Sequence, residues 1–408
     1  MIRSGLAVLV LVMALAVGTP ALAVVGALDN VPAATLLLPF FQVDLNDPDG
    51  VTTLLSINNA SATAILAHVT FWSDLSVPTL AFNVYLTGFD VYTLNLRDVF
   101  TSGVVPATAS DGQDPKDTIS PQGDFSQDIN FASCNGQLPL PPLDPVQLAH
   151  VRAAHTGQAS PIFGGLCTGV DFADNVARGY ITIDTVNNCT LRVPGDVGYF
   201  EADVTFQNVL WGDYFYVDPG NNFAQGENFA HLEASPTTLG AANYTFYRRY
   251  TTVDFREGLA STWGTRFLNG GPFDGGTTVA VWRDSKRTII PFSCALVAPA
   301  PFPLGHTQIV AFDEQENPDV TADPSIFPWE ANLIQVGGPD LPVPFDFGWL
   351  YLNLNTTVLG SQVPFEPVTQ NHVTVVHSAE GRFSVGHRVL MFDNVTTPGA
   401  ATNVVIGP

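Results

Sequence analysis

The residues best suited to chemistry form a short stretch of oxygen-bearing side chains. The stretch comprises Asp44, Asn46, Asp47 and Asp49. Proteins hold Ca²⁺ with about six to eight oxygen ligands, which carboxylates and amides supply. The stretch departs from an EF-hand loop, because Pro48 stands where that loop has an oxygen ligand. We therefore expect either a calcium site or an Asx-rich hairpin turn, which uses Asn, Asp and Gly for backbone reasons.

A second acidic run allows the same two interpretations. It comprises Asp313, Glu314, Glu316, Asp319 and Asp323. We expect a solvated loop here, with calcium binding as the alternative.

Catalytic motifs are missing from the sequence. It contains no G-x-S-x-G, H-E-x-x-H, G-x-x-x-x-G-K or S-x-x-K pattern. The densest histidine cluster comprises His372, His377, Glu380 and His387. His372 and His377 are five positions apart, so in a strand they point to opposite faces and do not share a metal. We therefore nominate no catalytic residue.

Aromatic side chains stack on sugar rings, and two stretches are rich in them, 214–216 and 244–250. In a strand only alternate members share a face, so about half should be core. Glycoside hydrolysis needs two carboxylates roughly 5 to 9 Å apart. The 38 acidic residues do not allow such a pair to be chosen. A carbohydrate-binding module or a glycoside-active enzyme is therefore an alternative function.

Four cysteines form an even set without a C-x-x-C pair, which favours disulfides over zinc or redox chemistry. We predict the pairs Cys134–Cys167 and Cys189–Cys294, with free thiols as the alternative. The first pair is favoured because the segment between those cysteines looks self-contained. In it, Asp144 and Pro145 suit the start of a helix that covers 148–156 and ends at Gly157.

The elements that must position these residues are mainly strands. The sequence contains 35 Gly and 31 Pro but only two Lys, which fits poorly with long helices. Alternation of apolar and polar residues predicts strands at 52–57, 65–72, 82–86, 91–96, 180–186, 202–206, 244–250, 278–282, 308–312, 349–354, 373–376 and 383–391. Their short spacing indicates an antiparallel sandwich.

The order of features occurs twice. Residues 50–55 (GVTTLL) are echoed by 275–280 (GGTTVA), 69–74 (VTFWSD) by 309–314 (IVAFDE), and 179–184 (GYITID) by 348–353 (GWLYLN). Strand-turn-strand units around 211–213 and 379–381 close the two copies. We therefore predict an all-β protein of two immunoglobulin-like antiparallel sandwiches, related by duplication. The first covers 24–235, with a disulfide-bracketed loop and helix insertion at about 106–175, and the second covers 236–408.

The N-terminal residues are typical of a signal peptide. Arg3 precedes the apolar stretch 5–17, and Ala21-Leu22-Ala23 fits a cleavage site. A membrane anchor is the alternative, but the apolar stretch is too short for a hydrocarbon core about 30 Å thick. We expect residues 1–23 to be removed and the mature chain, which has no predicted membrane span, to be secreted to the periplasm, cell surface or extracellular space.

The charge balance limits the partners. The formal net charge is -23, with 15 Lys and Arg against 38 Asp and Glu. Such a chain is poorly suited to neutralising phosphates, so we expect no nucleic acid partner. Unaided docking on anionic membranes is disfavoured for the same reason.

Four segments carry a resemblance to a known group of proteins. They are 36–41 (LLLPFF), 53–59 (TLLSINN), 82–91 (FNVYLTGFDV) and 179–183 (GYITI). In these segments the first half of the chain resembles exported bacterial proteins of unknown function that carry an immunoglobulin-like sandwich. The resemblance implies a location and a fold, and it supplies no catalytic residues.

Together these features predict an exported, non-enzymatic protein that acts through its surfaces as a structural or adhesive component. Open sheet edges would allow self-assembly by strand addition. Its partners would be copies of itself, cell-surface or matrix components, or carbohydrate. The only cofactor we expect is calcium, in a calcium-stabilised adhesin.

Overall fold

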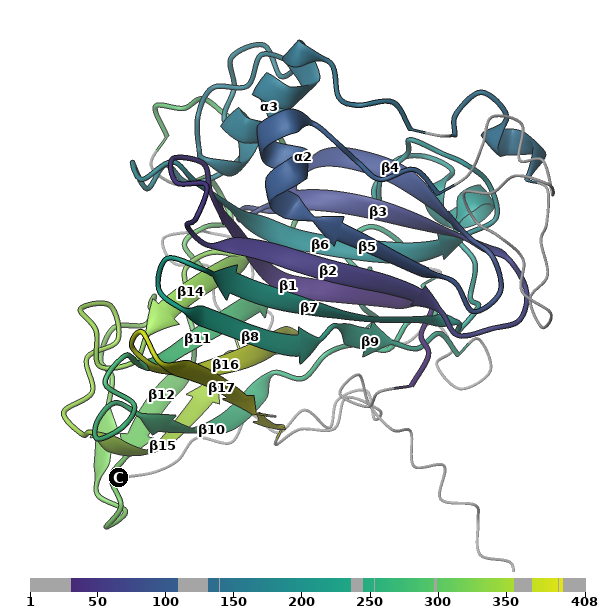
Figure 1. Cartoon of the computed structure of the whole chain (residues 1–408). Coiled ribbons are helices and arrows are strands. Elements are labelled where there is room, and N and C mark those ends of the chain that lie inside the picture. Colours follow the sequence, from purple (N-terminus) through teal and green to yellow (C-terminus); the bar gives the residue numbers. More distant parts are fainter. Residues whose placement is uncertain are drawn as a thin grey trace, which may run out of the picture.

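The structure is a computed structural model that describes residues 31–108, 131–138, 140–235, 245–252, 254–296, 299–355, 369–387 and 389–391. The predicted signal peptide and part of the predicted insertion lie outside these residues. Within them, the strands form four antiparallel sheets arranged as two open sandwiches (Figure 1). The predicted all-β fold is confirmed.

In the described residues, the first sandwich contains a sheet in the order β4-β3-β6-β1-β9 and a sheet in the order β5-β2-β7-β8. Its strands are β1 (Thr35–Asp44), β2 (Thr52–Asn59), β3 (Ile65–Ser73), β4 (Pro78–Leu86), β5 (Val91–Asn95), β6 (Val176–Val186), β7 (Leu210–Asp218), β8 (Phe223–Asn228) and β9 (Ala230–Leu232).

The second sandwich repeats the first strand by strand. In the described residues its sheets have the orders β13-β12-β15-β10-β18 and β14-β11-β16-β17, so β10 takes the place of β1 and β18 that of β9. Its strands are β10 (Thr262–Leu268), β11 (Gly276–Arg283), β12 (Gln308–Phe312), β13 (Pro318–Val320), β14 (Ala331–Gln335), β15 (Phe347–Asn353), β16 (Asn371–Ala379), β17 (Phe383–His387) and β18 (Leu390–Met391). Among the described residues, every strand of one sandwich has a counterpart in the other.

Two glycines show why the echo is physical. Trp72 on β3 pairs with Tyr180, the second residue of the echo 179–184. In the same way, Phe312 on β12 pairs with Trp349, the second residue of the echo 348–353. The first residue of each echo is Gly179 or Gly348. A Cβ there would overlap the carbonyl oxygen of Trp72 or Phe312. Both copies therefore keep a glycine at the point where two backbones approach closely.

A second repeated feature is a threonine whose hydroxyl bonds both backbone groups of one residue on the neighbouring strand, which we call the latch threonine. The hydroxyl of Thr53 accepts from the backbone N–H of Gln42 (3.1 Å) and donates to its carbonyl (3.1 Å). Thr277 makes the same pair of bonds to Leu268, at 2.7 and 3.0 Å. The sequence echo matched Thr52 with Thr277. It is therefore one residue out of register at this strand, an error that exchanges the two faces.

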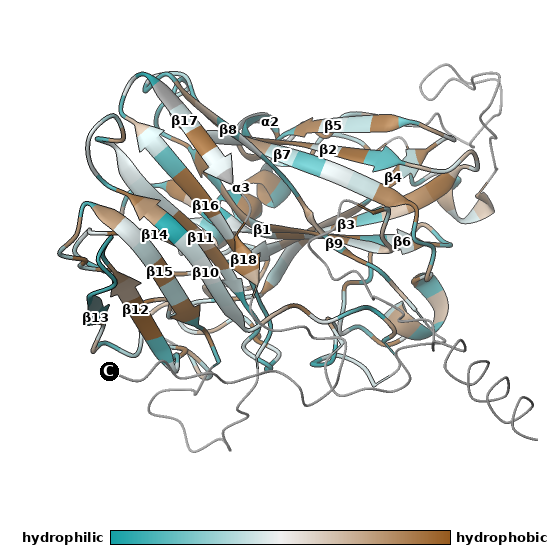
Figure 2. Ribbon diagram, turned by 90° about the horizontal axis from the view of Figure 1, so that it is seen from below, coloured by the Kyte–Doolittle hydropathy of each residue, from teal (hydrophilic) through white to brown (hydrophobic). Residues whose placement is uncertain are grey.

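The two sandwiches share apolar packing through one sheet. On β11, Val279 and Val281 face the second core, whereas Ala280 and Trp282 belong to the first. The Trp282 ring lies edge-on to Tyr180, with centroids 5.9 Å apart. Figure 2 shows the sheet containing β11 and β16 between β1 and the second sandwich's other sheet. This sheet is therefore buried on both faces, which makes the two sandwiches one body.

Within the described residues, two α-helices flank the first sandwich, α2 (Leu96–Ser102) and α3 (Pro145–His155). The Asp144 side chain caps α3 by accepting from the backbone N–H of Val146 (2.8 Å) and Gln147 (2.9 Å). Gly157, with a φ of 71°, follows the helix. The predicted helix and its caps are confirmed. None of the helices within the described ranges has the length and apolarity needed to span a membrane.

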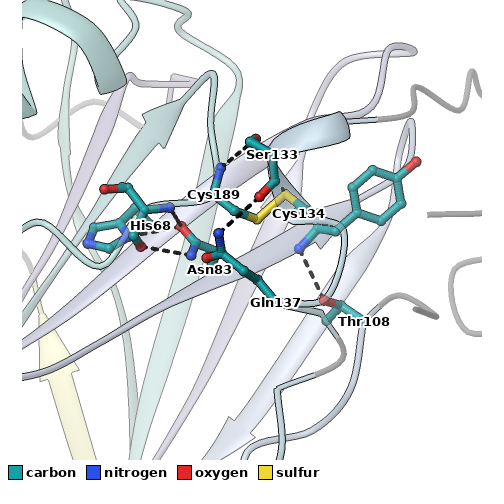
Figure 3. Close-up of a disulfide and its surroundings, with 9 residues drawn as sticks. His68, Asn83, Thr108, Ser133, Cys134, Gln137 and Cys189 are labelled. Atoms are coloured by element: carbon teal, nitrogen blue, oxygen red, sulfur yellow. Dashed lines mark hydrogen bonds between the residues drawn. A yellow bond between two sulfur atoms is a disulfide. The ribbon is translucent and has the colours of Figure 1, made fainter. Parts of the chain in front are cut away.

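All four cysteines form disulfides, but the predicted pairing is wrong. The bonds are Cys134–Cys189 and Cys167–Cys294. The first joins Cys134, the last residue of a short 3₁₀ helix (Ala132–Cys134), to Cys189, whose backbone N–H donates to Ser133 Oγ at 3.0 Å (Figure 3). Each cysteine of the expected bracket therefore bonds outside it, since the insertion folds onto two different neighbours rather than onto itself.

Several local strand predictions are also wrong. Residues 199–203 form a π-helix (Tyr199–Asp203) where a strand at 202–206 is expected, and 246–250 form turns. Residues 211–213, expected at a turn, lie within β7, whose turn follows at 219–222. The sequence prediction omits β1, β8, β9, β10, β13 and β14. β1 was missed because it is buried on both faces and does not alternate.

Candidate functional site

A groove of about 460 Å³ lies between the two sandwiches and is the candidate functional site. Its walls are the turn after β7, the turn after β16, the start of β11 and the end of β14. The two turns occupy equivalent places in the two copies, as do Val51 before β2 and Gly275 before β11. The groove therefore exists only because two copies are joined.

The floor of the groove is largely apolar. It contains Tyr216, Leu333, Val376 and Ala379. Tyr216 is 3% exposed, and its hydroxyl donates to the carbonyl of Phe40 at 2.7 Å. The floor is fixed by packing, so a ligand would meet a preformed surface.

The rim of the groove is polar and internally braced. Asn222 Nδ2 donates to the carbonyl of Gly381 at 3.2 Å, so the side chain joins the turns of the two copies. Arg382 holds both carboxylate oxygens of Asp274 at 2.8 Å. This guanidinium lowers the pKa of the Asp274 carboxyl. Asp274 is therefore a poor proton donor at neutral pH.

The carboxyls with raised pKa lie elsewhere. Burial raises the pKa of Asp74 to about 7 and also raises those of Asp254 and Glu330. None of the three lines the groove. Each has at most 3% of its surface exposed. The geometry of the groove therefore suits binding better than general acid–base catalysis.

The predicted calcium loop has a well-defined local geometry. Asp44 Oδ1 accepts from the backbone N–H of Asn46 (2.8 Å), and Asp47 Oδ1 accepts from that of Asp49 (2.9 Å). The guanidinium of Arg97 donates to backbone carbonyls of the same loop, those of Asp44, Asp47, Gly50 and Val51. These are the bonds of an Asx turn closed by an internal cation. Calcium at this loop stays a prediction.

Nor do other acidic or histidine groups converge. Among the described residues, no three His, Cys, Asp or Glu side chains lie close enough together to hold a metal. His377 Nδ1 hydrogen-bonds Thr277 Oγ1 at 2.9 Å, whereas His372 packs edge-on against Trp263 at 5.6 Å. Asp313 accepts from the backbone N–H of Gln315 at 2.8 Å in an exposed turn. The two histidines therefore have separate partners, as their spacing predicts.

The aromatic stretches are mostly interior. Tyr214 and Tyr216 are buried and Phe215 is 44% exposed, which is the alternation of a strand with one covered face. In the second stretch Phe246 and Tyr247 are buried, and Tyr244 lies outside the described residues. Neither stretch forms an exposed stacking platform within the described residues.

Two buried ion clusters are absent from the sequence prediction. Arg249 pairs with Glu330 and lies 3.6 Å from Asp284. Arg256 lies 3.5 Å from Asp184 and 3.3 Å from Asp254. Both arginines come from the link between the sandwiches. Sequence patterns gave no signal for them, because Glu330, Asp284 and Asp184 are distant in sequence from their arginines and follow no periodicity.

Comparison with protein-family models, curated proteins and solved structures finds no match for this chain. Any functional conclusion therefore depends on the residues themselves.

Proposed function

We propose that this protein is exported and acts without catalysis, as a structural or adhesive component of the cell envelope or extracellular space. The observation that carries the proposal is the shared packing of the two sandwiches around Trp282 and Tyr180. A body joined in this way resists bending between its halves, which suits a protein that holds or contacts other surfaces.

Export is supported by three independent features. Both disulfides are of the kind that persists in oxidising compartments. The first 23 residues have the pattern of a signal peptide. The formal charge of -23 keeps an exported protein dispersed.

Protease treatment of intact cells tests this proposal. If the protein lies at the surface, added protease removes it while a cytoplasmic marker survives, and it migrates differently with and without reductant. Lysed cells provide the control for cleavability. Full-length protein found only with the cytoplasmic marker, with reduced cysteines, would contradict export.

Self-assembly by strand addition is a second candidate, and β5 is the edge that favours it. Among the other edge strands, β4, β8, β13 and β17 are covered or short. The outward N–H of Tyr85 on β4 donates to Thr108 Oγ1 (3.0 Å), and His150 Nε2 contacts the carbonyl of Thr79 (2.9 Å). β8 and β17 cover each other, with Ser384 Oγ donating to the carbonyl of Ala224. The short β13 begins with Pro318, which also discourages pairing.

The ladder geometry leaves Thr93 as the accessible point of β5. The N–H of Asn59 donates to the carbonyl of Asp90 at 3.0 Å, which sets the phase of the β2–β5 ladder. The backbone groups of Val91 and Thr93 therefore point away from β2. The N–H of Val91 already donates to Asp90 Oδ1 at 2.8 Å, which leaves that of Thr93 for a second strand. A strand from a second copy could pair along this edge.

Light scattering across a concentration series tests assembly. We expect the molar mass of the wild type to rise with concentration and Thr93→Pro to stay monomeric, because proline removes an edge donor without touching the β2 ladder. Thr93→Ala keeps the N–H and should assemble as the wild type does. A wild type that remains monomeric at every concentration would exclude strand addition.

A further inference from the structure

We propose that the groove between the sandwiches binds a neutral oligosaccharide. This inference rests on the proposed function, since it names the ligand through which such a protein would hold its surroundings. Three properties of the groove carry it: unused hydrogen-bonding groups, an apolar floor and a rim that keeps an unpaired carboxylate.

The first property is hydrogen-bonding capacity that the protein does not use. Gln42 and Gln335 line the groove, and so does Glu380. Across the described part of the chain, the side chains of these three residues make no hydrogen bond to another residue. Each amide can donate and accept at once. Adjacent sugar hydroxyls, which also donate and accept, match such groups.

The second property is the floor between these side chains. Leu333 is half-buried and Val376 is buried, and Phe223 stands partly exposed at the wall. A sugar ring presents C–H groups on its faces and hydroxyls around its edge. An apolar floor with polar groups at the rim is therefore complementary to a ring lying flat in the groove.

The third property is the charge. Arg382 compensates Asp274, and Asp218 accepts from Asn221 Nδ2 at 2.8 Å. Glu380 keeps its carboxylate unpaired at the rim. An anionic ligand would meet this carboxylate within a chain of formal charge -23, so repulsion disfavours it. A neutral ligand avoids that repulsion and still uses the carboxylate as an acceptor.

The size of the groove agrees with this ligand class. Its volume of about 460 Å³ lies within the range of about 300 to 1,000 Å³ typical of small-molecule sites. The site needs both copies, because Gln42 comes from β1 of the first sandwich and Gln335 from β14 of the second. A bound oligosaccharide would therefore bridge the two sandwiches.

A glycan array probed with the full mature chain, followed by calorimetry with the best neutral ligand, tests the proposal. We expect Gln42→Ala and Gln335→Ala each to weaken binding by about tenfold or more, because each removes a two-way hydrogen-bonding group. Gln315→Ala, in an exposed turn outside the groove, is the matched control and should bind as the wild type does. Thermal melts verify that all variants are folded.

Three results would overturn the proposal: no neutral glycan bound, binding unaffected by both groove variants, or binding displaced by a lysine-rich peptide with higher affinity. The proteolysis of intact cells is independent of the groove. Failure on the array would leave the proposed export and surface role standing, and a cytoplasmic location would overturn that role without changing the array result.

Discussion

Asn59 in the first sandwich and Arg283 in the second occupy the same place. Each stands six residues after its latch threonine, at the end of β2 or β11. Asn59 Nδ2 donates to the carbonyls of Thr63 (2.8 Å) and Thr87 (2.9 Å). Arg283 donates to four carbonyls, those of Leu304, Gly305, Phe327 and Leu354. Both side chains thus hold the loops at one end of their sandwich.

The difference between them follows from loop length. Residues 60–64 join β2 to β3, whereas 284–307 join β11 to β12. A short loop brings its carbonyls within reach of an amide, and a long loop needs a longer side chain with more donors. The fold therefore specifies a donor at this position, and the loops select its length.

A second pair of equivalent positions holds a charged residue in one sandwich and a neutral residue in the other. Asp184 faces Thr35 in the β1–β6 ladder, and Asn353 faces Thr262 in the β10–β15 ladder. Asp184 joins the ion cluster of Arg256, whereas Asn353 accepts from a neighbouring amide. The sandwich itself therefore needs a buried acceptor here, while the ion cluster belongs to the link between the copies.

The largest expected effect on the free energy of unfolding comes from the disulfides. Each of them anchors the long segment between β5 and β6, which makes the first sandwich longer than the second. Replacing Cys167 and Cys294 by serine should lower the free energy of unfolding by about 5 kcal/mol, and replacing Cys134 and Cys189 by about 4 kcal/mol. The order follows from sequence separations of 127 and 55. Urea unfolding measures both.

The control is urea unfolding under reductant, where neither the wild type nor the double variants keep a disulfide. All three proteins should then unfold at the same urea concentration. A Cys134/Cys189 variant less stable than the Cys167/Cys294 variant would show that native packing, rather than loop closure, sets the order.

The two loop-holding side chains give the next effect. Arg283→Met keeps the bulk but leaves four buried carbonyls without a donor, so we expect a loss of about 4 kcal/mol. Asn59→Ala exposes two carbonyls and should cost about 2 kcal/mol. Arg283→Lys, which keeps fewer donors, should fall between. Equal losses at Asn59 and Arg283 in urea unfolding would contradict the account in which the number of carbonyls held sets the cost.

Sequence reasoning recovered what local physics determines. Strands with one covered face alternate, which is why β2 and β5 were predicted, and the helix after Asp144 follows from its capping residues. The echo at Gly179 and Gly348 was found because backbone approach allows only glycine. β1 escaped because its residues do not alternate, whereas β3, which is also buried on both faces, was found because His68 and Thr70 alternate with apolar residues.

The candidate site could not be predicted in the same way. Gln42 and Gln335 are nearly three hundred positions apart in sequence, and only the packing of two sandwiches brings them to one groove. The disulfide pairing failed for a related reason. Cys167 meets Cys294 because the insertion packs on the second copy, a contact that no local pattern records.

The smallest expected effect, for each pH unit, is on the pH dependence of the free energy of unfolding. It concerns one buried histidine from each half of the molecule. Burial lowers the pKa of His155 to about 3 and that of His372 to about 4. Both stay neutral in the folded state, so their contribution is present above pH 6.5 and is lost as pH falls toward those values. Each should remove about 1.4 kcal/mol per pH unit below 6.5.

Asp74 should oppose this trend, because its folded pKa of about 7 lies above the ordinary value of 3.8. Its contribution is present below pH 3.8 and is lost as pH rises through 7, so acidification favours the folded state. Asp74→Asn should therefore lose stability more steeply between pH 6.5 and 4.5, and His372→Gln less steeply. Urea unfolding at each pH gives the free energy of unfolding of the wild type and the two variants. If this free energy changed with pH equally in all three proteins, neither group would change its protonation on folding.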